Sequence, residues 1–398
     1  MLKNSHEKLK NYINLYFSLY EMQFIPTLGC ALIDRGKILV VPLMLGLAAF
    51  FSIWYLLVQM ETLENIFALT FNVNITISSV QSIVTFLTIN VMSKEKLLKA
   101  LVFFDDIADT KVEHLTKSRE KYLTKNLKIA WKIVRLYIIG ILSGSLIFMV
   151  IGILQTNYTS PLYYRIPGIP SNSIWMRPLN IIVQTVLFYI YSGCIVNMDC
   201  LILSYLFYFR GELYAINAIA EMLCNKEENS KEILVTIYTA HRRILHEFSE
   251  IYNLLWHFYC QKLFAVSLYL CSGFFVFARI NQSISIGVLL QSFIVCQLII
   301  LCMPGQLTDN CSEKLRGTLY MNFWYEMKLE DQKNLLMLMI GAQRNIQAKT
   351  IGIGRVSVYT LVQVRIYLRV IRVIPLKGVY SFSSHEENFH LRKQTRYA

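Results

Sequence analysis

The chain has few charged residues for its length. Asp, Glu, Lys and Arg make up 16% of its 398 residues, whereas hydrophobic residues make up 55% and the mean hydropathy is +0.43. Soluble domains are about one quarter charged, so this composition argues against soluble domains and predicts a membrane protein. The sequence also lacks internal repeats and low-complexity tracts, and we expect residues 1–398 to form a single bundle.

Motifs for enzymatic chemistry are missing as well. The nine cysteines are scattered without CxxC spacing, so neither a zinc site nor a redox motif is indicated. No GxSxG, GxxxxGK(S/T) or strand-associated GxGxxG motif occurs. His241, His246 and His257 lie near one another in sequence, but no acidic ligand completes a metal site, and we interpret them as interfacial polar residues. We therefore expect no enzymatic activity, no cofactor and no bound metal.

The N-terminal segment indicates whether a signal peptide is present, and the net charge indicates whether the chain contacts lipid or nucleic acid. The first 24 residues are polar and basic, without a continuous apolar core before a small-residue cleavage site, so we expect no cleaved signal peptide. The net charge of +13 (pI near 9.2) is typical of proteins that contact nucleic acid or anionic lipid. Because the basic residues flank apolar segments and form no compact basic domain, we expect a lipid bilayer and no nucleic acid.

Seven apolar segments are long enough to cross a bilayer, which takes about 20 residues in a helix. They cover 38–59, 66–91, 133–155, 180–207, about 255–278 and 284–304, with a seventh that begins near 334 and resumes at about 351. We therefore predict an all-α membrane protein with seven transmembrane helices.

Positive charge is distributed very unevenly between the two sides of this arrangement. The segments that share one side hold 23 Lys and Arg; they are 1–37, 92–129, 208–250 and 305–335. The opposite side holds three, namely Arg165, Arg177 and Arg279. Because positively charged loops stay in the cytoplasm, we predict a cytoplasmic N-terminus and an extracellular C-terminus. G-protein-coupled receptors have the opposite orientation, and the outer segments here lack the Cys of their usual loop-to-helix disulfide, so we disfavour that class.

The segment 157–178 is the longest on the predicted outer side. It contains four prolines and cannot continue a helix, so we expect a lid over the outer face. Asn157 and Asn281 begin glycosylation sequons on this side. Asn74 and Asn310 also begin sequons, one inside a span and one in a cytoplasmic segment, so the pattern alone does not establish glycosylation.

Two long segments extend the spans into the predicted cytoplasm. Within 238–264 apolar residues recur at helical spacing, which predicts that the fifth span continues as a helix beyond the bilayer. We expect 208–255 and 305–345 to be helical and to mediate subunit assembly, with packing inside one subunit as the alternative. Asp105 and Asp106 lie in a Lys-rich stretch that we expect to be a loop, and we interpret them as part of a solvated face.

The second to fourth spans combine aromatic and Met side chains with hydroxyl groups in their outer halves. Such a mixture predicts a pocket for a small, mostly apolar ligand, with an ordinary bundle core as the alternative. The spacing of Gly140 and Gly144 matches GxxxG and predicts close packing of helices. The expected pocket residues are Phe71, Ile75, Ser145, Phe148, Met149, Gly152, Phe188 and Tyr191.

The segment after the sixth span carries a family signature. The sequence MPGQLTDNCSEKLRGTLYMNFWYEM (303–327) has a Gly, a Ser, and a Tyr and Trp four residues apart: Gly305, Ser312, Tyr320 and Trp324. It resembles the signature of the insect odorant receptor family, and LLMLMIGAQRNIQAKTIGIGRVSVYTL (335–361) resembles the start of that family's last helix. Gustatory receptors share the layout, usually with another final motif, and are the alternative. A transporter is disfavoured because we see no inverted repeat or broken midplane helix.

This resemblance implies a ligand-gated, non-selective cation channel of olfactory sensory transduction, in the plasma membrane of olfactory neuron dendrites. Four subunits would meet through the cytoplasmic ends of the fourth to seventh spans, and a volatile odorant would bind in each subunit's outer half. Most members open only beside a co-receptor subunit, and this chain lacks the long insertion of that co-receptor, so we expect a tuning subunit in a heterotetramer. The seventh helix would line the pore; its residues here include Ile351, Val356, Val358, Tyr359 and Val362.

The sequence departs from the family pattern after about residue 362. Arg365, Arg369 and Arg372 share one helix face, and each Arg near the bilayer centre costs about 2.5–3.5 kcal/mol. Pro375 interrupts the same run. We therefore expect 363–398 to be an atypical tail. Either the last helix is shortened or displaced, or these residues come from an altered splice or gene-model end.

Overall fold

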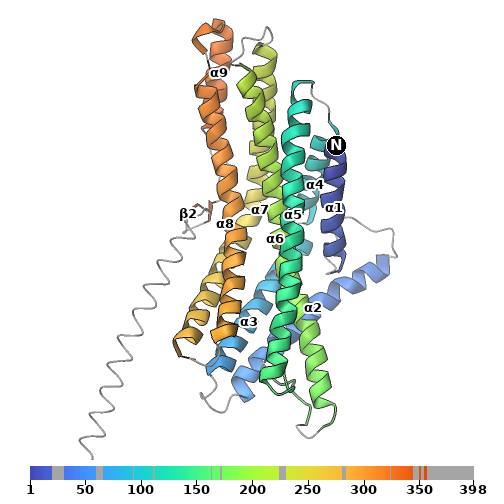
Figure 1. The fold of residues 1–398 in the computed structure, drawn as a ribbon. Coiled ribbons are helices and arrows are strands. Elements are labelled where there is room, and N and C mark those ends of the chain that lie inside the picture. Colours follow the sequence, from blue (N-terminus) through green and yellow to red (C-terminus); the bar gives the residue numbers. More distant parts are fainter. Residues whose placement is uncertain are drawn as a thin grey trace, which may run out of the picture.

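The computed structural model describes residues 1–19, 31–59, 66–92, 94–110, 113–162, 164–170, 173–223, 230–279, 284–322, 324–343, 349–350 and 354–355. Long helices run side by side, and shorter helices gather at the end of the bundle that carries the N-terminus (Figure 1). The long helices are α2 (Ala31–Trp54), α3 (Ile66–Leu87), α5 (Glu113–Gln155), α6 (Met176–Met222), α7 (Ser230–Arg279) and α8 (Ile284–Tyr320). The shorter ones are α1 (Leu2–Leu19), α4 (Lys94–Asp109) and α9 (Leu329–Ala342), with the π-helical turns η1 (Tyr55–Gln59) and η2 (Thr88–Met92) and the 3-10 turn η5 (Trp324–Glu326).

Three helices are much longer than a bilayer requires. α5, α6 and α7 contain 43, 47 and 50 residues. At about 1.5 Å per residue each exceeds twice the hydrocarbon thickness of about 30 Å. Within the described residues, five apolar stretches are long enough to cross a membrane: Val40–Val58, Ala68–Asn90, Leu115–Leu154, Met176–Met222 and Ile294–Tyr320. They overlap the predicted first three spans, contain the fourth and overlap the sixth. The predicted fifth span, 255–278, lies within α7.

Helix α6 forms the centre of the bundle. It packs against α2, α3, α5, α7 and α8, and every residue from Tyr191 to Phe209 is buried. A helix that is apolar on all sides is stable in such a central position. In contrast, α2 exposes Leu43, Phe50 and Ile53, as expected for a helix whose outer face contacts lipid.

Helices α5 and α6 approach each other closely at Gly211. A Cβ atom at this position would lie 2.6 Å from Leu123 Cδ1 and 3.1 Å from Leu123 Cα, so a larger side chain would separate the two helices. On the adjacent turn, the Arg119 guanidinium forms a buried ion pair with the Glu212 carboxylate. Burial of both charges is tolerated because each has the other as a hydrogen-bonded partner.

Helix α4 is held against α1 and α7 by ion pairs. Asp105 accepts hydrogen bonds from His6 Nε2 (2.6 Å) and Lys10 Nζ (2.7 Å), while Asp106 pairs with Arg243 on α7. Burial lowers the pKa of His6. Burial opposes ionisation of Asp105, but the hydrogen bonds from Lys10 and His6 outweigh it and lower the pKa of that carboxyl. The prediction that the two aspartates lie in a loop is therefore wrong: both lie on α4, and their partly exposed side chains tie this helix to its neighbours.

The loop between α5 and α6 folds back over the first turns of α6, at the end of the bundle opposite α9 (Figure 1). Two amides of α6 hold it. Gln184 accepts a hydrogen bond from Leu162 N (2.9 Å) and donates one to Tyr164 O (2.6 Å), and Asn180 accepts one from Ile166 N (3.1 Å). Because these donors and acceptors belong to the loop backbone, the loop has a fixed position despite having no regular secondary structure.

The C-terminal part of the described chain is not helical beyond α9. β1 (Lys349–Thr350) and β2 (Gly354–Arg355) pair as antiparallel strands, with Lys349 opposite Arg355. The prediction that a helix resumes at about 351 is therefore wrong for residues 354–355. Thr350 is β-branched and Gly354 is a poor helix former, so both suit an extended strand better than a helix. The predicted pore residues, Ile351, Val356, Val358, Tyr359 and Val362, and the tail 363–398 lie outside the described residues.

Candidate ligand-binding site

A cavity of about 500 Å³ lies inside the bundle among α3, α5, α6, α7 and α8. Small-molecule sites in proteins measure about 300–1,000 Å³. Most of its lining is apolar or aromatic. The lining residues are Phe71, Asn74, Ile75, Ser78, Ile133, Leu136, Tyr137, Gly140, Ile141, Gly144, Ser145, Phe148, Phe188, Tyr191, Ser192, Ile195, Tyr269, Ile294, Cys296, Gln297 and Ile300.

One wall of the cavity is a row of stacked aromatic rings contributed by three helices. The ring centroids of Phe71 and Phe148 are 5.2 Å apart, and those of Phe148 and Phe188 are 5.8 Å apart with only 10° between the ring planes. Tyr191 meets Phe188 edge to face at 5.1 Å. Offset stacks and edge contacts of this kind are the favoured arrangements of aromatic pairs. The wall therefore offers flat apolar surfaces to a ligand.

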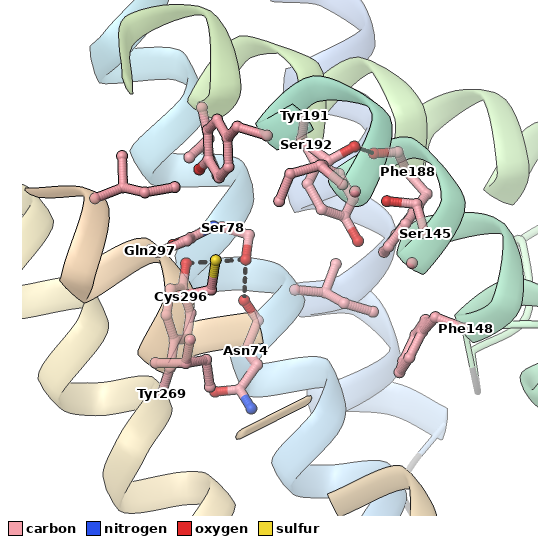
Figure 2. Close-up of a pocket in the computed structure, with 18 of the residues that line it drawn as sticks. Asn74, Ser78, Ser145, Phe148, Phe188, Tyr191, Ser192, Tyr269, Cys296 and Gln297 are labelled. Atoms are coloured by element: carbon pink, nitrogen blue, oxygen red, sulfur yellow. Dashed lines mark hydrogen bonds between the residues drawn. The ribbon is translucent and has the colours of Figure 1, made fainter. Parts of the chain in front are cut away.

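The opposite side of the cavity is polar. Figure 2 shows Asn74, Ser78, Tyr269 and Gln297 on this side, across from Phe148, Phe188 and Ser145. Ser78 Oγ lies 2.9 Å from the Tyr269 hydroxyl, which also lies 3.1 Å from Gln81 Oε1. Asn74 accepts a hydrogen bond from Ser272 Oγ (2.8 Å). The polar groups therefore form a network that joins α3 to α7 beside the cavity.

A buried ion pair lies directly behind the cavity wall. Tyr137 lines the cavity and donates a hydrogen bond to Asp199 Oδ2 (2.7 Å). Lys262 Nζ contacts Asp199 Oδ1 (2.6 Å) and Oδ2 (2.5 Å). These three residues come from α5, α6 and α7 and are buried. The group connects one wall of the cavity to three helices at once.

Six of the eight predicted pocket residues line this cavity: Phe71, Ile75, Ser145, Phe148, Phe188 and Tyr191. Met149 does not, because its side chain is buried in the adjacent core. Position 152 does not either. A Cβ atom on Gly152 would lie 2.2 Å from Pro161 O, so this glycine allows the end of α5 to touch the loop that follows it.

The expected role of Gly140 and Gly144 is also wrong. A Cβ atom at either position would meet nothing within 4 Å, so neither glycine mediates a close helix contact. Both line the cavity instead, and the absence of side chains there enlarges it. The close contact between α5 and α6 occurs at Gly211, which has no partner in a GxxxG pattern.

Several important residues were not predicted from the sequence. Lys262 lies within the predicted fifth span, and a lysine inside an apolar segment is itself a signal of a functional or paired group. Gln297 lies within the predicted sixth span and gives a weaker signal of the same kind. Tyr137 and Tyr269 have no distinguishing pattern, because tyrosine is common in bundle cores.

The sequence and the fold each match known proteins. The sequence model of the 7tm odorant receptor family matches residues 61–365, which is most of the chain. The chain belongs to the odorant receptor family. A comparison of this odorant receptor with curated proteins gives no match.

Two solved structures share the fold of this odorant receptor. One is the insect olfactory receptor OR5 from Machilis hrabei, with a TM-score of 0.79, 12% sequence identity, and coverage of 93% of this chain and 98% of the other. The second is the same receptor in complex with eugenol, with a TM-score of 0.77, 13% identity, and coverage of 94% and 99%. The predicted fold class, an all-α membrane protein with seven transmembrane helices, is confirmed. The side of the membrane on which each terminus lies stays a prediction.

The signature residues of this odorant receptor separate into two kinds. Gly305 and Ser312 are buried on the inner face of α8, whereas Tyr320 and Trp324 are 66% and 50% exposed. The family match also decides against an enzyme and favours an odorant receptor over a gustatory one. Among the described residues, no group of three or more His, Cys, Asp or Glu side chains could hold a metal ion.

The sequons of this odorant receptor lie in different surroundings. Asn157 is exposed at the end of α5, with a positive φ of 51°. Asn281 lies outside the described residues. Asn74 is buried and hydrogen-bonded within the cavity network, so it is inaccessible to a glycan. Asn310 accepts a hydrogen bond from Gln306 on the surface of α8.

Proposed function

We propose that this odorant receptor is a tuning subunit of a ligand-gated, non-selective cation channel. It would open beside a co-receptor subunit, in the plasma membrane of olfactory neuron dendrites. The observation that supports this proposal most directly is the cavity of about 500 Å³ inside the bundle of an odorant receptor. Its stacked aromatic wall suits a small volatile ligand with a mostly apolar body.

An exposed apolar surface supports assembly with other subunits. At the end of α8, η5 and α9, several large apolar side chains are exposed: Tyr320, Met321, Trp324, Tyr325, Leu329, Leu336, Met337 and Ile340. Clusters of exposed aromatic and apolar residues mark interaction sites. We propose that this surface contacts a neighbouring subunit of the heterotetramer, in line with the assembly role expected for 305–345.

The channel proposal is tested by recording currents from cells that express the chain with and without an odorant co-receptor subunit. An odorant panel is expected to evoke inward cation currents from the pair, and no currents from either subunit alone with the same odorants. A tagged chain that reaches the cell surface beside the co-receptor but never responds to a broad panel would contradict the proposal.

The orientation is a separate proposal, supported by the unequal charge of the two sides. Epitope tags placed before Met1 and after Asn157 distinguish the two possibilities. In intact cells, antibody is expected to label the second tag and not the first. The reverse pattern would overturn the cytoplasmic placement of the N-terminus.

The atypical tail 363–398 has its own test. The family match ends at residue 365, close to the position at which the sequence departs from the family pattern. We expect a chain with a family-like ending in place of 363–398 to give larger odorant currents at equal surface expression. Equal currents from both chains would show that the tail does not limit conduction.

A further inference from the structure

Gln297 has the features of a ligand-binding residue. It lies on α8, lines the cavity and is only 4% exposed. Its side-chain amide makes no hydrogen bond with any residue that the structure describes, whereas buried amides normally find partners. An amide contains two N–H donors and a carbonyl acceptor, and neither kind of group has a partner among the described residues.

The hydroxyl groups of Ser78 and Tyr269, on the same side of the cavity, already donate their hydrogens to protein oxygens. Ser78 Oγ donates to Asn74 O (2.8 Å). The hydrogen of Tyr269 has two acceptors in reach, Ser78 Oγ and Gln81 Oε1. In either arrangement both hydroxyl hydrogens point to protein oxygens. The two hydroxyl oxygens can therefore accept a hydrogen bond from a ligand through their lone pairs.

We propose that this receptor selects odorants that carry a hydroxyl group on an aromatic or apolar body, and that Gln297 is the residue that recognises the hydroxyl. This inference rests on the proposed function of the cavity. A hydroxyl both donates and accepts, so it can satisfy the carbonyl and the N–H of the Gln297 amide, and it can donate to the Ser78 and Tyr269 oxygens (Figure 2). An aldehyde or ketone can only accept a hydrogen bond, and a hydrocarbon leaves the Gln297 amide without a partner.

The arrangement of the cavity gives such a ligand one orientation. The aromatic wall of Phe71, Phe148 and Phe188 receives the flat apolar body. The polar side with Gln297 lies across the cavity and receives the hydroxyl (Figure 2). An amphipathic molecule with its oxygen at one end therefore matches both walls, whereas a molecule polar at both ends would place one polar group against Phe rings.

The test uses three probes with equal numbers of non-hydrogen atoms: 2-phenylethanol, phenylacetaldehyde and propylbenzene. Receptor and co-receptor are expressed together, and concentration–response curves of the odorant current are compared. The wild type is expected to respond at the lowest concentration to the alcohol, and at a concentration about tenfold higher to the hydrocarbon, because unpaired polar groups are costly. Gln297→Leu should abolish this preference and retain the response to propylbenzene.

Two further comparisons separate recognition from folding. Gln297→Met repeats the loss of the amide with a different apolar shape and should have the same effect. Gln306→Leu makes the same change as the first variant on the same helix, at a glutamine that bonds Asn310 and does not line the cavity. It should keep the preference for the alcohol. Retention of that preference in both Gln297 variants, or its absence in the wild type, would overturn the inference.

A binding measurement keeps the inference distinct from channel function. Thermal unfolding of the purified receptor in detergent reports ligand binding without conduction, because a ligand that binds only the folded state raises the midpoint. The three probes should stabilise the wild type in the same order as their potency. Stabilisation in that order without any current would uphold the role of Gln297 and contradict the proposed channel. Equal stabilisation by all three probes would contradict the role of Gln297 alone.

Discussion

Lys262 and Asp199 form a buried ion pair between α7 and α6, with Lys262 Nζ 2.6 and 2.5 Å from the two carboxylate oxygens. The side chain of Lys262 is fully buried and that of Asp199 is 3% exposed. Moving either charge out of water is costly, and the pair is stable because each charge neutralises the other. Tyr137 adds a third bond to the carboxylate, from the wall of the ligand cavity.

The first prediction follows from this pairing. Lys262→Met or Asp199→Leu alone leaves one buried charge without its partner and should reduce the free energy of unfolding by about 3–5 kcal/mol. The double variant removes both charges and should be more stable than either single variant. Thermal unfolding in detergent measures all three. Lys231→Met, which breaks the exposed pair with Glu330, serves as a control and should leave the midpoint unchanged.

The stability of the double variant, compared with the two single variants, tests whether Lys262 and Asp199 interact. If the effects of Lys262→Met and Asp199→Leu simply add in the double variant, the two residues do not interact and the pairing is refuted. A double variant close to the wild type would show that the two residues interact and that the pair adds little net stability.

The second prediction concerns the contact between α5 and the loop that follows it. In Gly152→Ala the new Cβ atom would lie 2.2 Å from Pro161 O, so the loop backbone must shift. We expect a loss of about 1–3 kcal/mol of stability, typical of overpacking. Gly46→Ala on α2 is the matched control, because a Cβ atom there meets nothing within 4 Å. An unchanged midpoint for Gly152→Ala in thermal unfolding would show that the loop is not held at this point.

The third prediction concerns the aromatic wall. Phe148 stacks against both Phe71 and Phe188, and it lines the cavity. Phe148→Leu keeps an apolar side chain and removes the ring, so it should reduce the preference for 2-phenylethanol over 2-cyclohexylethanol by about threefold to tenfold, since each aromatic pair contributes about 0.5–1.5 kcal/mol.

Concentration–response curves with these two alcohols measure the third prediction, because the hydroxyl group is common to both. Phe50→Leu is the control: Phe50 is half exposed on the outer face of α2 and does not line the cavity. An undiminished preference for the aromatic ring in Phe148→Leu would contradict a role for the aromatic wall.

Sequence patterns predicted the fold class and much of the cavity, but not its polar side. Long apolar segments and clustered aromatic residues are properties of the local sequence, so the spans and residues such as Phe71 and Phe148 could be found. The rotation of each helix about its axis depends on tertiary packing. Gln297 and Tyr269 could therefore not be assigned to the cavity, and Gly140 was assigned to a helix contact that it does not make.

The same limit applies to the paired charges. Lys262 and Asp199 are 63 residues apart in sequence, and only the packing of α7 against α6 brings them together. The ion pairs of Asp105 and Asp106 likewise depend on the position of α4 between α1 and α7. Charge patterns within one segment do not contain this information, which is why this helix was expected to be a loop.

The fourth prediction is a pH dependence that arises at His241, on the part of α7 outside the predicted span. Its side chain is 3% exposed, and its Nε2 atom has no hydrogen-bond partner in the part of the chain that the structure describes. Burial lowers its pKa to about 4, from an ordinary value of 6.5. Between these two values the unfolded chain binds a proton that the folded chain does not, so stability falls as the pH decreases from about 6.5 to about 4.

The loss at His241 should reach about 3 kcal/mol at the lower end of this range, at 1.36 kcal/mol per pKa unit. His241→Leu removes the titrating group and should flatten the corresponding part of the profile of unfolding midpoint against pH. His246→Leu, at an exposed position on the same helix, should keep the profile of the wild type. Parallel profiles for the wild type and His241→Leu would show that the acid sensitivity has another origin. The next candidate is the buried His6, which is hydrogen-bonded to Asp105.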